Sequence, residues 1–344
     1  MSEIRINPFT TQCIVRDPRL FFGRKTELDT IWGYLRKDAN VSIVAERRMG
    51  KSSLLWFVKE MAKDHLEAQA RVHYLDMELV PDSEDFFSRL AEVLNAGGET
   101  VRDLERALAN QRLILCMDEF DRTANHFDAF PRDFFAVLRG LSQGPALTLA
   151  IATKTPLIDF SASGGMTSPF YNIFPPAPLT LGMFSEAEAR DLFVKTAARA
   201  EVKFDDTILA AAIRLAEGHP WRLQLLGHYL VESGLKWDEA QKRFESAMAE
   251  EEDRAALSLN DEALDLKETA FRIEGEAVKG EEIKPPDIWR DRLAAGAGLL
   301  TFIASAFAFY SVTAREPLSM FIAIALVLGV VAGYVGWRFK ERRG

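Results

Sequence analysis

The sequence predicts an α/β domain, a parallel sheet with helices on both faces, followed by an all-helical lid and an apolar C-terminal hairpin. In the first half of the 344 residues, apolar runs of strand length alternate with helical patterns. From Phe184 onward the pattern is purely helical, and two long uncharged runs stand near the C-terminus. These three observations predict several structural units in one chain.

The expected strands come first, because they define the sheet. Their ranges are Val41–Ala45, Val72–Met77, Leu113–Met117, Leu147–Thr153 and, more weakly, Leu179–Leu181. Helical patterns lie between and before them, at Glu27–Lys37, Ser52–His65, Ser83–Ala96, Thr100–Asn110 and Phe130–Leu141. Strands that alternate with helices in this way form parallel sheets covered on both faces.

The later helices and the boundaries follow from capping and charge. Ser185-Glu-Ala-Glu188 is a capping box, which marks a helix start. Further helices are expected at Asp206–Glu217, Trp221–Ser233 and Trp237–Ala256. We divide the chain into an N-terminal arm (1–18), an α/β domain (19–183), a helical lid (184–249), a charged linker (250–292) and a hairpin with a basic tail (293–344).

A phosphate-binding loop is indicated directly after the first strand. Residues 45–53 read Ala-Glu-Arg-Arg-Met-Gly-Lys-Ser-Ser and end in the Gly-Lys-Ser triplet of a P-loop. Lys51 can neutralise β- and γ-phosphate charge, and the Ser52 hydroxyl can hold Mg²⁺. The other loop residues expected around the phosphates are Glu46, Arg47, Arg48, Met49, Gly50 and Ser53. The full pattern begins with Gly, and Ala45 stands in that place.

Two adjacent carboxylates, Asp118 and Glu119, follow the apolar strand at Leu113–Met117. In a nucleotide site the Asp would organise the Mg²⁺ shell, and the Glu would polarise a water for attack on the γ-phosphate. The alternative, a carboxylate that only caps the next turn, is common for a lone strand end. The P-loop upstream favours the nucleotide site.

With these residues, the chain resembles a bacterial AAA-like branch of the AAA+/STAND ATPases, whose sheets are of the ASCE type. The matching segments are Phe21-Phe-Gly-Arg-Lys-Thr-Glu-Leu28, the P-loop, Met117-Asp-Glu-Phe-Asp121 and Ser168-Pro-Phe-Tyr-Asn172. The resemblance covers roughly residues 15–245. It implies ATP and Mg²⁺ as cofactors, with Phe22, Gly23 and Arg24 as contacts on the adenine side.

The resemblance also assigns sensor residues. Thr153 or Lys154 occupies the position that detects the γ-phosphate. The alternative is that this segment is simply the end of a strand and has no sensor role. Gly218-His-Pro220 resembles the lid motif, so His219 and Pro220 would close over the nucleotide and Arg222 would act as a second sensor. For an arginine finger acting across a subunit interface, Arg139 and Arg132 are the candidates.

A membrane hairpin is expected from Leu293–Val312 and Leu318–Trp337, each 20 residues without a charged side chain. Either run is long enough to cross a hydrocarbon core about 30 Å thick. Basic residues flank the pair on both outer sides, which predicts that both termini and the ATPase domain are cytoplasmic, at a bacterial inner membrane. A buried hairpin of a soluble protein is the alternative, although such helices normally show a polar stripe.

The net charge of −9 argues against a nucleic-acid coat, and Cys13 and Cys116 belong to no metal or redox spacing. We therefore expect a membrane-anchored ATPase that acts as a slow nucleotide switch, with an unidentified protein partner and homo-oligomerisation. Two alternatives stay open. The hairpin could perturb the bilayer under ATPase control, or the protein could hold ATP as a scaffold without hydrolysing it.

Overall fold

The computed structural model describes residues 7–11, 14–162 and 168–254. Both expected membrane runs and nearly all of the linker lie outside these ranges. Within them, no helix combines the length and the hydropathy needed to cross a bilayer.

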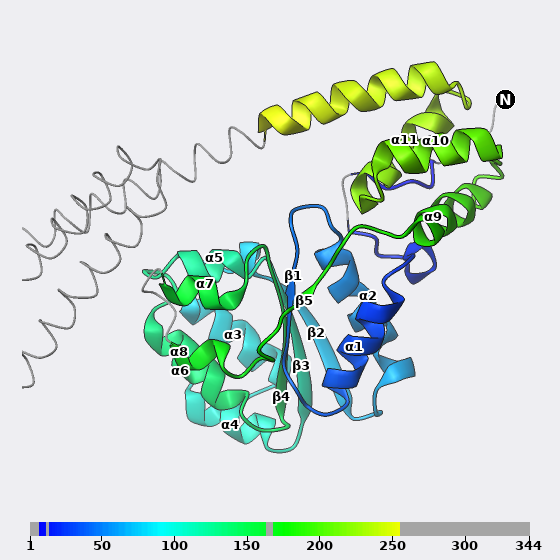
Figure 1. Ribbon diagram of the computed structural model, residues 1–344. Helices are drawn as coiled ribbons and strands as arrows, with labels where there is room; N and C mark the ends of the chain where they lie inside the picture. Colours follow the sequence, from blue (N-terminus) through cyan, green and yellow to red (C-terminus); the bar gives the residue numbers. More distant parts are fainter. Residues whose placement is uncertain (1–6, 12–13, 163–167, 255–344) are drawn as a thin grey trace, which may run out of the picture. The chain divides into compact units, whose positions relative to one another are not determined.

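A five-stranded sheet forms the centre of the α/β part (Figure 1). Its strands are β1 (Val41–Val44), β2 (Ala70–Asp76), β3 (Arg112–Asp118), β4 (Leu147–Thr153) and β5 (Leu179–Thr180). They stand in the order β2-β3-β4-β1-β5, and every pairing is parallel. The predicted parallel sheet is confirmed, and β4 lies between β1 and β3, as in ASCE-type sheets.

Helices cover both faces of this sheet, as expected (Figure 1). One face carries α1 (Lys25–Leu35) and α2 (Lys51–His65). The other carries α3 (Ser83–Leu94), α4 (Val101–Leu108), α5 (Asp121–Asn125), α6 (Arg132–Leu141), α7 (Leu157–Ala162) and α8 (Ser168–Tyr171). Two short 3₁₀ helices, η1 (Pro18–Leu20) and η2 (Met77–Leu79), complete the α/β part.

The alternation of strand β3 shows why both faces are apolar. Leu113, Leu115 and Met117 enter the core beneath α3 to α8, whereas Ile114 and Cys116 enter the core beneath α1 and α2. Successive side chains of a strand point to opposite faces, so a strand buried on both faces reads as one continuous apolar run. Asp118 continues the Ile114–Cys116 series and therefore belongs to the face of the P-loop helix α2.

The lid consists of α9 (Glu186–Ala198), α10 (Asp206–Ala216) and α11 (Pro220–Glu232), followed by a helix over 237–254 that leads toward the C-terminal part. Ser185 and Glu188 form the predicted capping box at the start of α9. A separate apolar core joins these helices, and Phe9 of the N-terminal arm is part of it.

Candidate functional site

The P-loop connects β1 to α2 and takes its shape from two residues in the left-handed region. Gly50 has φ of 91° and Arg48 has φ of 63°. Ala45 adopts no positive φ. Its backbone N–H donates to the Thr153 carbonyl at 3.2 Å, which extends the β1–β4 pairing by one residue. The missing first glycine is therefore tolerated, because this position continues the strand and needs no special backbone freedom.

Lys51 is folded back across the loop. Its ammonium group donates to the Ala45 carbonyl at 2.7 Å and to the Glu46 carbonyl at 3.0 Å. Burial lowers the pKa of Lys51, and the nearby carboxylates of Glu119, Asp121 and Asp118 oppose that shift. These neighbours place the amine between the loop and the acidic end of β3.

Asp118 and Glu119 stand at the carboxyl end of β3. Asp118 is 2% exposed and accepts a hydrogen bond from the Tyr74 hydroxyl at 2.7 Å. The Glu119 backbone N–H donates to the other Asp118 oxygen at 3.1 Å, and φ of Glu119 is 49°. Burial and the Asp118 charge raise the pKa of Glu119. Glu119 is half-buried and lines a cavity beside the P-loop.

At the predicted sensor position, at the end of β4, the Thr153 hydroxyl and the Lys154 backbone N–H both have hydrogen-bond partners within the chain. The Thr153 hydroxyl donates to the Thr155 carbonyl at 2.7 Å, and Thr153 is fully buried. The Lys154 backbone N–H donates to both Asp121 oxygens, at 2.8 and 2.9 Å. Thr153 and Lys154 are not among the described residues that line the cavity.

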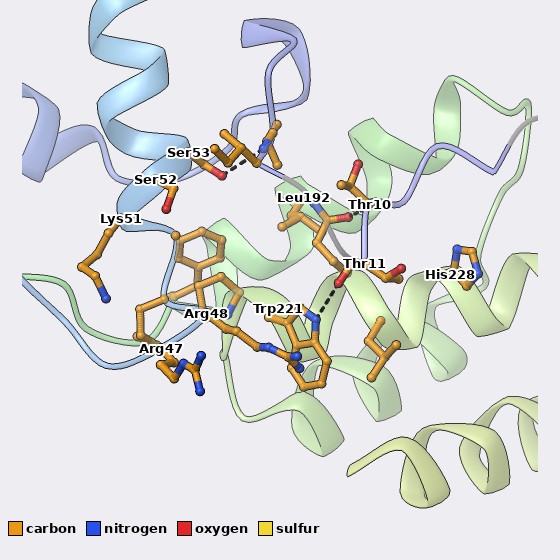
Figure 2. Close-up of a pocket in the computed structure, with 18 of the residues that line it drawn as sticks. Thr10, Thr11, Arg47, Arg48, Lys51, Ser52, Ser53, Leu192, Trp221 and His228 are labelled. Atoms are coloured by element: carbon orange, nitrogen blue, oxygen red, sulfur yellow. Dashed lines mark hydrogen bonds between the residues drawn. The ribbon is translucent and has the colours of Figure 1, made fainter. Parts of the chain in front are cut away.

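A cavity of ≈ 840 Å³ opens beside the P-loop (Figure 2). Lys51 and Ser52 lie at one end and His228 at the other, with Arg48 and Trp221 between them. The P-loop side also includes Arg47, Met49, Gly50 and Ser53. The rest of the wall comes from the N-terminal arm, from Leu20, Phe21, Phe22 and Arg24, from Glu119, and from Phe184 and the helices after it.

The N-terminal arm holds these parts together. The backbone N–H of Val15 donates to the Ser53 hydroxyl at 3.0 Å, at the start of the P-loop helix. The Thr10 N–H donates to the Gln224 side chain at 3.1 Å, and the Trp221 indole N–H donates to the Thr11 carbonyl at 2.8 Å (Figure 2). The arm therefore contacts both the phosphate loop and α11.

The Gly23-Arg24 turn contacts the P-loop through the Arg24 side chain. Both residues are left-handed, with φ of 70° and 62°. The Arg24 side chain is 4% exposed and donates to the Met49 carbonyl at 3.1 Å and to Glu27 at 3.0 Å. Phe22 and Arg24 line the cavity, whereas Gly23 is not among its described lining residues, and the role of all three as base-side contacts stays a prediction.

The Gly-His-Pro segment begins α11. His219 is the N-cap and accepts a hydrogen bond from the Trp221 backbone N–H at 3.2 Å. Partial burial and the neighbouring positive charges lower the pKa of His219 to about 4. Pro220 lines the cavity, but Arg222 pairs with Glu217 at 2.8 Å and is not among the described lining residues.

Arg132 and Arg139, the candidate arginine fingers, both belong to α6. Neither is among the described residues of the cavity wall. An arginine finger acts on a neighbouring subunit, so their distance from this chain's own cavity does not test the suggestion.

The donors near the P-loop suit magnesium. Ser52 and Asp118 offer a hydroxyl and a carboxylate, the hard oxygen ligands that Mg²⁺ takes together with water and phosphate. Among the described residues, no group of three His, Cys, Asp or Glu side chains forms a metal cage. Mg²⁺ bound to substrate phosphates needs only one or two protein ligands, so this donor set fits it.

The fold and the loop define the class of protein. A parallel sheet with a Gly-Lys-Ser loop after β1 and an Asp-Glu pair at the end of β3, with β4 between them, is that of a P-loop NTPase. The family model "Novel STAND NTPase 1" (nSTAND1) matches residues 8–265, which is more than half of the chain. The chain therefore belongs to the nSTAND1 family.

Solved structures show the same fold. The Walker-type ATPase PABY2304 of Pyrococcus abyssi has a TM-score of 0.53 and 16% identity, over 78% of this chain and 87% of that one. The Aeropyrum pernix ORC1 protein, solved in complex with DNA, has a TM-score of 0.51 and 17% identity, over 69% and 68%. Such low identities show the fold alone. None of the curated proteins matches the chain.

Two contributions to the site were not predicted from the sequence. Tyr74 bonds Asp118 from the neighbouring strand, and Trp221 lies in the cavity wall beneath Arg48. Tyr74 does carry a sequence signal, because it alternates with Val72 and Asp76 on one face of an expected strand. Trp221 directly follows the Gly-His-Pro segment, yet its contact with the P-loop joins residues too distant in sequence to be read from a local pattern.

Proposed function

We propose that the protein binds Mg²⁺-ATP in the cavity beside the P-loop and hydrolyses it slowly to ADP and phosphate. One observation carries this proposal. The same cavity is lined by the P-loop residues Lys51 and Ser52 and by Glu119, which follows the buried Asp118.

The residues divide the chemistry between them. The backbone N–H groups of the loop and the N-terminus of α2 attract the phosphates, and Lys51 exchanges its carbonyl partners for phosphate oxygens. Ser52 and Asp118 would hold Mg²⁺, which would supply neutralisation of the phosphate charge. Glu119 accepts a hydrogen bond from the attacking water and orients it.

The proposed base-side wall is apolar and aromatic. Phe21, Phe22 and Leu20 line the cavity beside the Gly-Arg turn, and Ile14 and Val15 of the arm line it as well. A flat purine ring gains from burial against such side chains.

We also propose that ATP hydrolysis switches a membrane-anchored protein. The support is sequence-based: the uncharged runs at 293–312 and 318–337, with basic residues outside them, fit a hairpin in a bacterial inner membrane with cytoplasmic termini. A protein partner and self-association belong to this proposal. The net charge of −9 gives no support to a nucleic-acid partner.

The test uses the full chain in detergent and measures the binding of a fluorescent ATP analogue and phosphate release. Lys51→Ala should lose binding, whereas Lys63→Ala, an exposed lysine on the same helix, should keep it. Glu119→Gln should bind ATP as tightly as the wild type and lose turnover. Unchanged turnover in Glu119→Gln would contradict its role, and tight binding without any turnover in the wild type would favour the scaffold.

The membrane proposal is tested separately. The full chain should stay in the membrane fraction after an alkaline wash, and a chain that ends before residue 293 should leave it. Ion leakage on expression that disappears with this deletion would instead favour a membrane effector.

A further inference from the structure

Tyr74 lies outside every motif of the site, yet its side chain reaches the acidic end of β3. In the β2–β3 pairing Tyr74 stands opposite Cys116, and Asp76 stands opposite Asp118. Side chains of Tyr74, Cys116 and Asp118 therefore share the face covered by α2. From this position the Tyr74 hydroxyl donates to one Asp118 oxygen at 2.7 Å.

The carboxylate of Asp118 is thus held at both oxygens. Tyr74 bonds one oxygen, and the Glu119 backbone N–H bonds the other at 3.1 Å. Each oxygen keeps a lone pair for a further partner, because a carboxylate offers about four acceptor sites. One donor on each oxygen restricts rotation of the Asp118 carboxylate. Asp118 is 2% exposed, so its carboxylate depends on partners within the protein.

The ring of Tyr74 is itself held from the P-loop helix. Trp56 of α2 meets it edge-on, with ring centroids 5.4 Å apart and planes at 70°. Arg16 and Lys59 lie against the Trp56 ring, with Arg16 Cζ 4.8 Å and Lys59 Nζ 4.0 Å from its centroid. The helix that begins with Lys51 and Ser52 therefore packs on the residue that orients Asp118.

The hydroxyl is a dependable donor. A phenolic O–H can donate a hydrogen bond, and the carboxylate of Asp118 beside it can only accept one. A hydrogen bond from a neutral phenol to a carboxylate is charge-assisted and stronger than one between neutral groups.

We propose that Tyr74 is a positioning residue for the metal: its hydroxyl fixes the rotation of the Asp118 carboxylate so that this group meets Mg²⁺ held by Ser52 and the nucleotide. The inference rests on the proposed function. Loss of a partner that orients a metal ligand typically weakens metal binding by about 10-fold to 100-fold.

The test variant is Tyr74→Phe, which removes one oxygen and keeps the ring against Trp56. Mn²⁺ binding is measured by electron paramagnetic resonance on the full chain in detergent, with a non-hydrolysable ATP analogue present. We expect Tyr74→Phe to weaken Mn²⁺ binding about 10-fold or more. Affinity for the analogue in EDTA should match the wild type, which also shows that the variant is folded. Tyr34→Phe, on α1, is the matched control and should bind Mn²⁺ normally.

Asp118→Asn separates the role of Tyr74 from the existence of the metal site. Weak Mn²⁺ binding in Asp118→Asn with normal binding in Tyr74→Phe would overturn the role of Tyr74 and leave the proposed metal site standing. Normal Mn²⁺ binding in both variants would overturn the metal site and the role of Tyr74 together. Weakened analogue binding by Tyr74→Phe in EDTA would also overturn the inference, because the tyrosine would then support the whole site.

Discussion

The guanidinium group of Arg48 lies over the indole ring of Trp221, with its central carbon 3.8 Å from the ring centroid. It also pairs with Glu251 at 2.8 Å. A residue of the phosphate loop is therefore bound both to α11 and to the 237–254 helix that leads toward the C-terminal part. Phosphate entering the loop would compete with Glu251 for this arginine.

Glu251→Gln should therefore strengthen nucleotide binding. The change removes a competing charge from the cavity wall, and a partly exposed ion pair is worth about 0.2–1 kcal/mol. We expect the affinity for an ATP analogue to rise about 1.5-fold to 5-fold at low salt, and less at high salt. Glu252→Gln removes the same charge from the next residue and is the control. An equal rise in both variants would indicate a general charge effect instead of competition at Arg48.

The pKa of His219, lowered to about 4, gives a pH dependence with a defined sign. Between the unfolded value of about 6.5 and the folded value, the unfolded chain binds a proton at His219 and the folded chain does not. Stability from this group is thus complete above about pH 6.5 and decreases as the pH falls toward 4.

His219→Asn should remove that component, because asparagine is a good N-cap and does not titrate. Urea midpoints measured between about pH 7 and pH 5 should fall more for the wild type than for the variant. Parallel curves for the two proteins would show that His219 is not the group responsible.

Gly218→Ala should destabilise the protein far more than Gly234→Ala. Both glycines have positive φ, 72° and 66°, so each substitution carries a backbone cost of about 1–2 kcal/mol. A Cβ on Gly218 would overlap the Phe184 carbonyl oxygen, whereas a Cβ on Gly234 meets nothing within 4 Å. The overlap should add about 1–3 kcal/mol, measured from denaturant midpoints. Equal effects would mean that the Phe184 segment moves aside freely.

Phe9→Ala should loosen the lid. Phe9 is 3% exposed and packs on Phe193 and Phe204, with centroids 5.7 and 6.2 Å away. Truncating a buried phenylalanine typically costs about 3–5 kcal/mol. We expect faster hydrogen exchange in α9 and α11 and a lower melting temperature. Leu79→Ala, at a side chain that is 67% exposed, should change neither. Unchanged exchange in Phe9→Ala would show that the lid core is stable without the arm.

Local patterns were enough for the sheet and the phosphate loop. Strand β4 has its predicted bounds, Leu147–Thr153, and the Ser185–Glu188 capping box is present. Strand β2 begins at Ala70, two residues before the expected start, because Ala70 and Arg71 pair with Arg112 and Leu113 of β3. The helices α5, α7 and α8 were not predicted, since helices of four to six residues are too short to show a period.

The contacts between residues far apart in the sequence, which build the site, could not be predicted from local patterns. Arg24 was predicted to contact the base, but its guanidinium also donates a hydrogen bond to the Met49 carbonyl. Phe9 belongs to a segment read only as an arm, yet it lies in the lid core. Such contacts depend on tertiary packing, and a single sequence carries no periodic signal for them.

The arm also affects the order in which the protein can fold as it is synthesised. Thr10 bonds Gln224, and 214 residue positions separate them. At about 5–20 residues per second, translation takes on the order of 10–40 s to cover that stretch. The segment around Phe9 is therefore synthesised well before α11, and Phe9 is covered only when the lid helices are present. The nucleotide cavity is completed only then, so a nascent chain can form its sheet well before it can hold a ligand.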